Sequence, residues 1–248
     1  MDAQQKEMFK QHEMGIEARR QEKLKKMTER DRLKAEEEFR KEAEARKAHH
    51  VPPTSQPYTA GVVEFAPDVA IGSANVTHNL LAYNNLTAQA KLKGVQIIVF
   101  PEDSLTGFRY SDRDAIYPYL EELPPIPKPP TIIIPCKDPK YADSPIFQEL
   151  SCIALRHKVV LAANMGEKQP CTSSDPHCPP DGRYQFNTDV VFENDGSFVT
   201  KYHKFNFNAD LPKIFDAPLA PEHITFTTSF GVTFGIFTCY DILFKDPP

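Results

Sequence analysis

Beyond residue 57, hydrophobic and polar positions follow the pattern of a domain that mixes strands with helices. Alternation over residues 58–65 predicts a strand, and residues 75–93 carry apolar side chains at a helical repeat that ends at Gly94. The nearly continuous apolar run at 95–100 is typical of a buried parallel strand. A strand–helix–strand unit is therefore predicted, which indicates the α/β class.

The second half of the chain continues with similar signals. In chain order they predict a helix at 145–157, a buried strand at 159–164 closed by Gly166, a hairpin of strands at 188–193 and 197–204, and an apolar strand at 231–241. The hairpin signal is strong because Asp195-Gly196 tolerates the positive φ that tight turns need. Irregular structure is expected at 123–130, where prolines crowd the chain.

The first 50 residues follow a different pattern. They contain no proline, and opposite charges recur one helical turn apart, as at Glu22/Lys26 and Glu36/Arg40. We predict a long charged helix at 1–50, and a lone helix is favoured over a coiled coil because its apolar residues keep no steady heptad. A proline-rich linker at 51–57 separates this helix from a domain at 58–248.

Composition narrows the classes of partner. The 248 residues carry a net charge of −5, and no basic stripe lies outside the N-terminal segment, which argues against nucleic acid as a partner. No apolar run reaches the ~18 residues of a membrane span. The N-terminus is charged where a secretory signal peptide would be apolar, so no signal peptide is predicted in this chain.

The five cysteines indicate two disulfides and one free thiol, namely an even cluster of Cys136, Cys152, Cys171 and Cys178, with Cys239 left over. Cys171 and Cys178 share a turn-rich loop and could close a short ring. A zinc site formed by these two cysteines with His177 is disfavoured, because the spacing matches no common zinc motif. Asn75 and Asn85 begin glycosylation acceptor patterns, so an oxidising compartment is favoured over a reducing one.

Three chemically capable side chains stand at predicted strand ends. Glu102 follows the strand at 95–100, Lys204 ends the second hairpin strand, and Cys239 lies at the tip of the last strand. Functional groups of α/β sheets collect at such ends. A thiolate attacks carbonyl carbon, a glutamate can take its proton, and a lysine can stabilise an oxyanion. The structural alternatives are that Glu102 solvates a strand end and that Lys204 is an ordinary surface lysine.

In this chain order, the three residues resemble the catalytic set of the nitrilase superfamily of carbon-nitrogen hydrolases. Further segments resemble the vanin and biotinidase branch, whose members are pantetheinases and biotin-amide hydrolases: Phe100-Pro101-Glu102-Asp103, Tyr202-His203-Lys204 and Phe237-Thr238-Cys239-Tyr240-Asp241. The resemblance covers residues 58–248 in several ordered blocks and does not reach residues 1–50.

The resemblance implies a four-layer αββα sandwich, C-terminally incomplete here because relatives continue well beyond the nucleophile. It implies that Glu102 is the general base, that Cys239 forms a thioester, and that Lys204 with a backbone amide near Tyr240 holds the oxyanion. Asp210 stands as a weak substitute for a second glutamate of the family. The resemblance also implies no metal or organic cofactor, a small-molecule amide substrate, an extracellular or secretory location and a homodimer.

Two functional alternatives stay open at this point. The chain is an amidohydrolase for a pantetheine or biotin amide, or an inactive or truncated relative that acts only through its N-terminal helix. A cysteine protease would need a histidine paired with the thiol, and His203 is the only histidine placed near a strand end.

Overall fold

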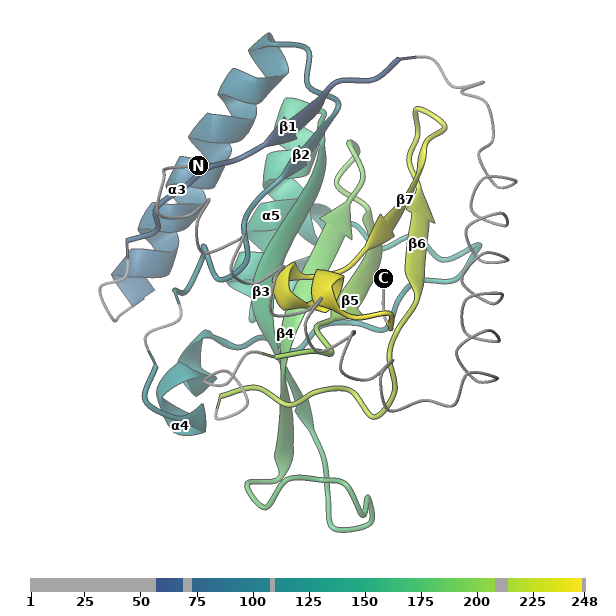
Figure 1. Cartoon of the computed structure of the whole chain (residues 1–248). Helices are drawn as coiled ribbons and strands as arrows, with labels where there is room; N and C mark the ends of the chain where they lie inside the picture. The colour runs from purple at the N-terminus through teal and green to yellow at the C-terminus, as the bar shows by residue number, and fades with distance from the viewer. Residues whose placement is uncertain (1–56, 69–72, 108–109, 208–213, 247–248) are drawn as a thin grey trace, which may run out of the picture. The chain divides into compact units, whose positions relative to one another are not determined.

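The computed structural model describes residues 57–248 apart from 69–72, 108–109, 208–213 and 247–248 (Figure 1). The charged helix predicted at 1–50 and the linker up to residue 56 therefore lie outside the described residues. Asp210 lies outside them as well, as does the side chain of Asn75.

A five-stranded mixed sheet forms the centre of the domain, in the order β1-β2-β3-β4-β5. Its strands are β1 (Ala60–Val62), β2 (Ile97–Val99), β3 (Val160–Pro170), β4 (Arg183–Phe192) and β5 (Phe198–His203). The first three strands run parallel, as predicted for the strand–helix–strand unit, and the β3–β4 and β4–β5 pairs are antiparallel. The carboxyl ends of β2 and β3 therefore point to the same edge of the sheet.

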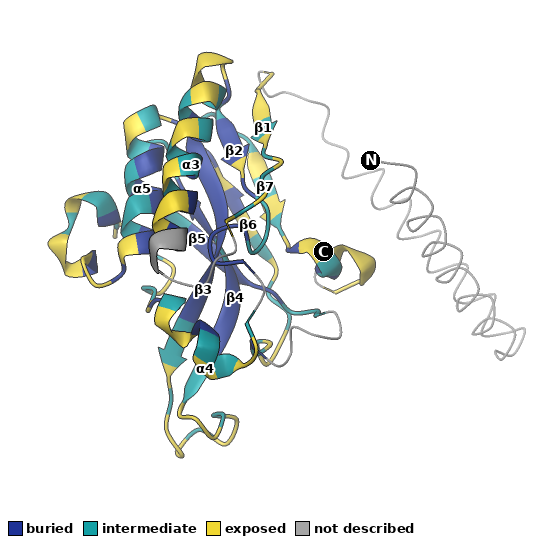
Figure 2. Ribbon diagram, turned by 90° about the vertical axis from the view of Figure 1, so that its left-hand side faces the viewer, coloured by how far each residue is buried: buried dark blue, intermediate teal, exposed yellow. Residues whose placement is uncertain are grey.

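Helices α3 (Ser73–Leu92) and α5 (Pro145–His157) cover one face of this sheet (Figures 1 and 2). The helix face of the sheet holds the largest apolar cluster, which includes Tyr83, Phe147 and Ile153. Burying such side chains contributes roughly 1.5–3 kcal/mol each. The remaining helical segments are short: α4 (Arg113–Ile116), η1 (Tyr117–Tyr119), η2 (Pro135–Lys137), η3 (Pro139–Tyr141) and η5 (Cys239–Leu243).

A hairpin of β6 (Ile224–Thr227) and β7 (Thr233–Ile236) packs on the opposite face of the sheet. Phe226 of the hairpin joins Ile97 and Val160 of the sheet in a second apolar cluster. The described residues thus form three layers, with the helices on one face of the five-stranded sheet and the β6–β7 hairpin on the other. This arrangement agrees with an α–β–β portion of the predicted sandwich.

The bounds of several predicted strands differ from the structure, and the last of them, predicted at 231–241, is limited to β7 (Thr233–Ile236). β1 is shorter than predicted because it pairs with β2 over only three residues. β3 does not close at Gly166 but continues to Pro170, since β4 pairs with it as far as Arg183. Glycine is required in mid-strand there, because a Cβ at Gly166 would lie 2.2 Å from Leu120 Cδ2.

Candidate active site

Glu102 and Lys204 meet although they are about a hundred residues apart in sequence. Glu102 follows β2, Lys204 follows β5, and the lysine Nζ forms an ion pair with Glu102 Oε1. Only 1% of Lys204 is exposed, so the interpretation of a surface lysine is wrong. A buried ammonium needs such a partner, because an unpaired charge would be costly to desolvate. The sheet thus brings together an acid and a cation in one place.

Cys239 opens the short η5 turn that follows β7, rather than ending the strand itself. Its φ is 46°, in the left-handed region that favours glycine. A non-glycine residue held there stores local strain, a feature that often accompanies functional sites. Asp241 anchors the turn, since it accepts hydrogen bonds from Thr238 N at 3.2 Å and from Tyr202 Oη at 2.6 Å.

Cys239 and Glu102 line the same cavity, and the carboxylate of Glu102 acts on the pKa of the thiol. Although the residue is exposed, protein atoms around the sulfur desolvate it and raise its pKa, and the charge of Glu102 acts in the same direction. Lys204 and the backbone N–H of Tyr240 act in the opposite direction, but the net shift is upward. At neutral pH the thiol is therefore protonated, and attack on a carbonyl requires a base beside it.

Three polar side chains behind the site were missed by the sequence analysis. Asn187 Nδ2 donates to Glu102 Oε1 at 2.9 Å, and Asn164 Nδ2 donates to Asn187 Oδ1 at 2.6 Å and to Asp189 Oδ1 at 2.9 Å. Asp189 Oδ2 in turn accepts from Thr238 Oγ1 at 2.5 Å. The available signal was the presence of these polar residues inside strands that are otherwise apolar.

Two further carboxyls beside Glu102 hold their protons more tightly than usual. Desolvation raises the pKa of Asp103 to about 7, with a smaller upward contribution from the charge of Glu102. Desolvation also raises the pKa of Asp189 to about 6, against the lowering effect of its hydrogen bonds with Thr238 and Asn164. Perturbed carboxyls of this kind concentrate at functional sites.

A cavity of about 640 Å³ lies next to these groups, between the sheet and the β6–β7 hairpin. Its walls are largely apolar and include Ile97, Ala162 and Phe234, while Glu102 and Cys239 contribute polar atoms. A mostly apolar cavity with a few placed polar groups is the usual form of a small-molecule site. The thiol of Cys239 and the carboxyl of Glu102 therefore face space that a small molecule could enter.

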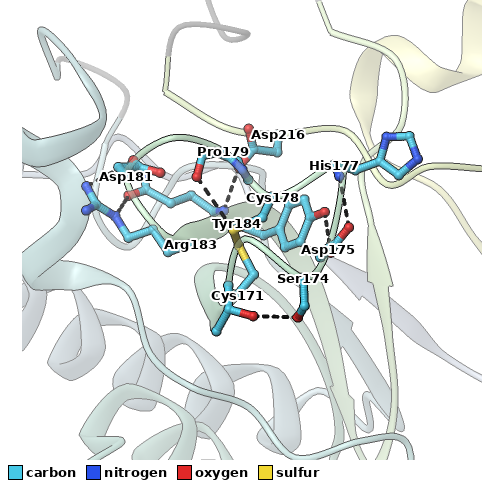
Figure 3. Close-up of a disulfide and its surroundings, with 12 residues drawn as sticks. Cys171, Ser174, Asp175, His177, Cys178, Pro179, Asp181, Arg183, Tyr184 and Asp216 are labelled. Carbon is cyan, nitrogen blue, oxygen red and sulfur yellow. Dashed lines mark hydrogen bonds and ion pairs between the residues drawn. A yellow bond between two sulfur atoms is a disulfide. The ribbon is translucent and has the colours of Figure 1, made fainter.

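Two disulfides are present, as predicted from the cysteine count, and the structure gives their pairing as Cys136–Cys152 and Cys171–Cys178, with Cys239 as the free cysteine. Figure 3 shows the second disulfide in its loop, with Tyr184 Oη donating to Asp175 Oδ2 at 2.8 Å. Both cysteines of the alternative zinc site are thus consumed, which contradicts that alternative.

His203 lies in β5 next to Lys204 but does not pair with the thiol. Its Nδ1 contacts Glu222 Oε1 and its Nε2 contacts Glu167 Oε2, each at 2.9 Å. Both ring nitrogens are therefore engaged by carboxylates, and the Cys–His pairing of a cysteine protease is not formed.

The other predicted site residues fall in different places. Asn85 is exposed on α3, while the side chain of Asn75 is outside the described residues, as is Asp210. The backbone N–H of Tyr240 lowers the pKa of the Cys239 thiol, and the ring of Tyr240 packs on Phe244 with centroids 5.4 Å apart. Among the described residues, no helix has the length and hydropathy needed to cross a membrane.

Residues 59–247 match the family model described as carbon-nitrogen hydrolase. The chain is 48% identical over 175 residues to pantetheinase of Mus musculus and 48% identical over 175 residues to biotinidase of Homo sapiens. These alignments cover 70% and 69% of this chain but only 33% and 31% of the relatives, so the chain spans about a third of the length of the curated relatives it matches.

Among solved structures, a carbon-nitrogen hydrolase from Helicobacter pylori G27 superposes with a TM-score of 0.52 at 22% identity. The superposition covers 75% of this chain and 53% of that one, and at this identity it shows the fold alone. Since the family model matches more than half of the residues, the chain belongs to the carbon-nitrogen hydrolase family.

Proposed function

We propose that this domain is a thiol-dependent amidohydrolase that cleaves linear amides. The observation that carries the proposal is the meeting of Glu102, Lys204 and Cys239 beside one cavity, in a chain of the carbon-nitrogen hydrolase family. The raised pKa of the thiol fits this chemistry, because a protonated nucleophile needs the base that stands next to it.

In the first half-reaction, Glu102 takes the proton of the Cys239 thiol as Sγ forms a bond to the amide carbonyl carbon. Proton transfer neutralises the carboxylate, so the Lys204 ammonium is freed to stabilise the oxyanion together with the backbone N–H of Tyr240. The C–N bond then breaks, and the leaving amine takes the proton from Glu102. The product of this half-reaction is an acyl thioester on Cys239.

In the second half-reaction, water gives a proton to Glu102 and its oxygen adds to the thioester carbonyl. The C–S bond breaks, and the departing thiolate recovers the proton from Glu102. A carboxylic acid is released and the starting protonation states are restored. Each step uses the same carboxyl as base and then as acid, which is consistent with one glutamate near the sulfur.

Pantetheine and biotinyl amides are the proposed substrates, because the relatives are named pantetheinase and biotinidase. The two disulfides support an oxidising, extracellular or secretory compartment, since disulfides persist there. A glycan at Asn85, a homodimer and a role for Asp210 stay predictions from the family resemblance.

The test is hydrolysis of two amides that release a coloured amine, one with a pantothenoyl group and one with a biotinyl group. We expect the purified chain to hydrolyse at least one of them and Cys239→Ala to lose at least about 10⁴-fold of that rate. Equal rates for the two proteins would favour the alternative of an inactive relative that acts through its N-terminal segment.

A further inference from the structure

Asn164 lies at the centre of the polar chain behind the site. It belongs to β3, is 3% exposed, and uses both its donor and acceptor groups. Its Nδ2 donates to Asn187 and Asp189, while its Oδ1 accepts from Asp103 N at 3.0 Å. Asn164 thereby connects the segment after β2 with two residues of β4.

The direction of these hydrogen bonds is set by the acceptors at both ends. An ionised Asp189 can only accept, so Asn164 turns its NH₂ group toward it, and the same NH₂ group meets Asn187 Oδ1. With its oxygen held by Asn164, Asn187 presents its own NH₂ group to Glu102. An Asn187 amide turned the other way would place an oxygen against the carboxylate.

The same asparagine is tied to the turn that carries the nucleophile. Asp189 accepts from Asn164 on one oxygen and from Thr238 Oγ1 on the other, and Thr238 directly precedes Cys239. The buried side chain of Asn164 is therefore connected both to Glu102, through Asn187, and to the turn that carries Cys239, through Asp189 and Thr238. Satisfied buried networks of this kind hold a single arrangement, whereas half-satisfied ones are costly.

We propose that Asn164 is a positioning residue of this site, which orients the Asn187 amide toward Glu102 and, through Asp189, holds the turn of Cys239 in place. The proposal rests on the proposed function for its kinetic consequences. Ala162 and Ala163 line the cavity, whereas Asn164 is not among the described lining residues, so it acts through its neighbours and not on the substrate.

The main test is the pH dependence of kcat/KM in Asn164→Leu, a change that keeps the branching of the side chain and removes its hydrogen-bonding groups. Without Asn164, the Asn187 amide is free to turn, and the carboxylate of Glu102 loses a hydrogen-bond donor. The acidic limb of the kcat/KM profile, where the rate falls as the pH is lowered, should therefore move up by about one pH unit. We expect kcat/KM to fall by up to about tenfold at pH values below the wild-type acidic limb and KM to stay within about twofold. The charged and titratable groups that face Glu102 are Asp103, Asp189, Lys204 and Cys239, and of these Asp189 also loses a hydrogen-bond donor in Asn164→Leu.

A matched control is Asn79→Leu. Asn79 is also fully buried and donates to the backbone oxygens of Asp68 and Leu105, and within the described part of the chain it forms no hydrogen bond with Asn164, Asn187 or Asp189. It should lose stability without moving the acidic limb. A folded Asn164→Leu whose acidic limb coincides with that of the wild type would overturn the proposal.

A double variant tests the route of the effect. Because Asn164 acts on Glu102 through Asn187, adding Asn164→Leu to Asn187→Leu should leave the acidic limb where Asn187→Leu alone puts it. Additive shifts of the limb would mean that Asn164 acts by another route, which contradicts the proposed relay.

A chain without hydrolytic activity would fail the proposed function but would still test this inference. Cys239 is the only free cysteine of the chain, so iodoacetamide reports the ionisation of its thiol. In Asn164→Leu the Asn187 amide no longer donates to Glu102, so the negative charge of this carboxylate acts more strongly on the thiol. The pH midpoint of Cys239 alkylation should therefore move to higher pH in Asn164→Leu but not in Asn79→Leu. An unchanged midpoint in a folded variant would overturn the proposal in this setting too.

Discussion

Residues 201–204, at the end of β5 and directly after it, take part in two buried ion-pair clusters. Only one of these clusters lies beside a cavity and a free thiol. Alternate side chains in this segment contact different partners. Lys201 and His203 contact Glu167. Tyr202 contacts Asp241, and Lys204 contacts Glu102. The alternation follows from the strand, whose side chains point to opposite faces. We call the group of Glu102, Lys204 and Asn187 the site cluster, and the group of Glu167, Lys201, His203 and Glu222 the closed cluster.

The closed cluster has partners for every charge. Glu167 is 0% exposed and accepts from Lys201 at 2.5 Å and from His203 at 2.9 Å, and Glu222 holds the other nitrogen of the histidine. The site cluster differs because its acid also faces a thiol and a cavity. A buried acid–lysine pair is therefore not evidence of catalysis by itself, and what matters is an adjacent nucleophile with room for a substrate.

The largest expected difference between the clusters is in activity. Glu102→Gln should lower kcat/KM by roughly 10²–10⁴-fold, because the proposed acid and base is lost. Glu167→Gln should lower the rate only in proportion to the unfolded fraction. Steady-state kinetics with the active thiol counted by titration measures both. A loss per folded molecule as large in Glu167→Gln as in Glu102→Gln would erase the distinction.

The two lysines give the next comparison. Lys204→Met should lower kcat by roughly 10²–10³-fold, because the proposed oxyanion loses a donor. Lys201→Met is the matched control three residues earlier, and its folded fraction should keep nearly the wild-type kcat. Circular dichroism establishes that each variant is folded before its rate is compared. Similar kcat values for the two variants would speak against a role for Lys204 at the oxyanion.

The loss of unfolding free energy should be larger for a substitution in the closed cluster than for one in the site cluster, which is the reverse of the order expected for activity. Glu167→Gln leaves Lys201 without its buried countercharge and should cost about 3–5 kcal/mol of unfolding free energy. Glu102→Gln removes a charge from a more open position and should cost less than this. Urea unfolding of both variants measures the difference. The contrast would be lost if Glu102→Gln proved the more destabilising of the two.

The smallest predicted effect is a pH dependence of the closed cluster. Desolvation lowers the pKa of His203, but its hydrogen bonds to Glu167 and Glu222 outweigh this and raise it. The pKa of Glu167 is shifted downward, since desolvation, which raises it, is outweighed by His203 and Lys201. The histidine therefore stabilises the fold fully below about pH 6.5 and less as pH rises through its folded pKa, whereas the glutamate stabilises it above about pH 4.3.

Unfolding free energies measured from pH 5 to pH 9 test this sign. The unfolding free energy of the wild type should fall more than that of His203→Gln over the alkaline part of the range. Parallel curves for the two proteins would show that protonation of His203 does not contribute to stability.

The sequence predicted the order of the main elements because their signals are local. The helix at 145–157 agrees with α5, and the Asp195-Gly196 turn connects β4 and β5 with Gly196 at a φ of 82°. The length of β3 could not be predicted, since its second half is stabilised by pairing with β4 across a long loop. The charged helix at 1–50 stays a prediction.

For the site, the sequence supplied residues but not their connections. Glu102, Lys204 and Cys239 were named from strand ends and from a family resemblance, and the structure brings them together. Asn164 and Asn187 were not predicted, because an asparagine inside a strand has no local pattern that separates a structural amide from one aimed at a distant carboxylate.

The raised pKa of Cys239 has a consequence for the rest of the chain. Thiol–disulfide exchange proceeds through the thiolate, and this chain holds a free thiol together with two disulfides. A thiol that is protonated at neutral pH rarely attacks those bonds. The environment that raises the pKa of Cys239 thereby also protects the covalent crosslinks from being reshuffled.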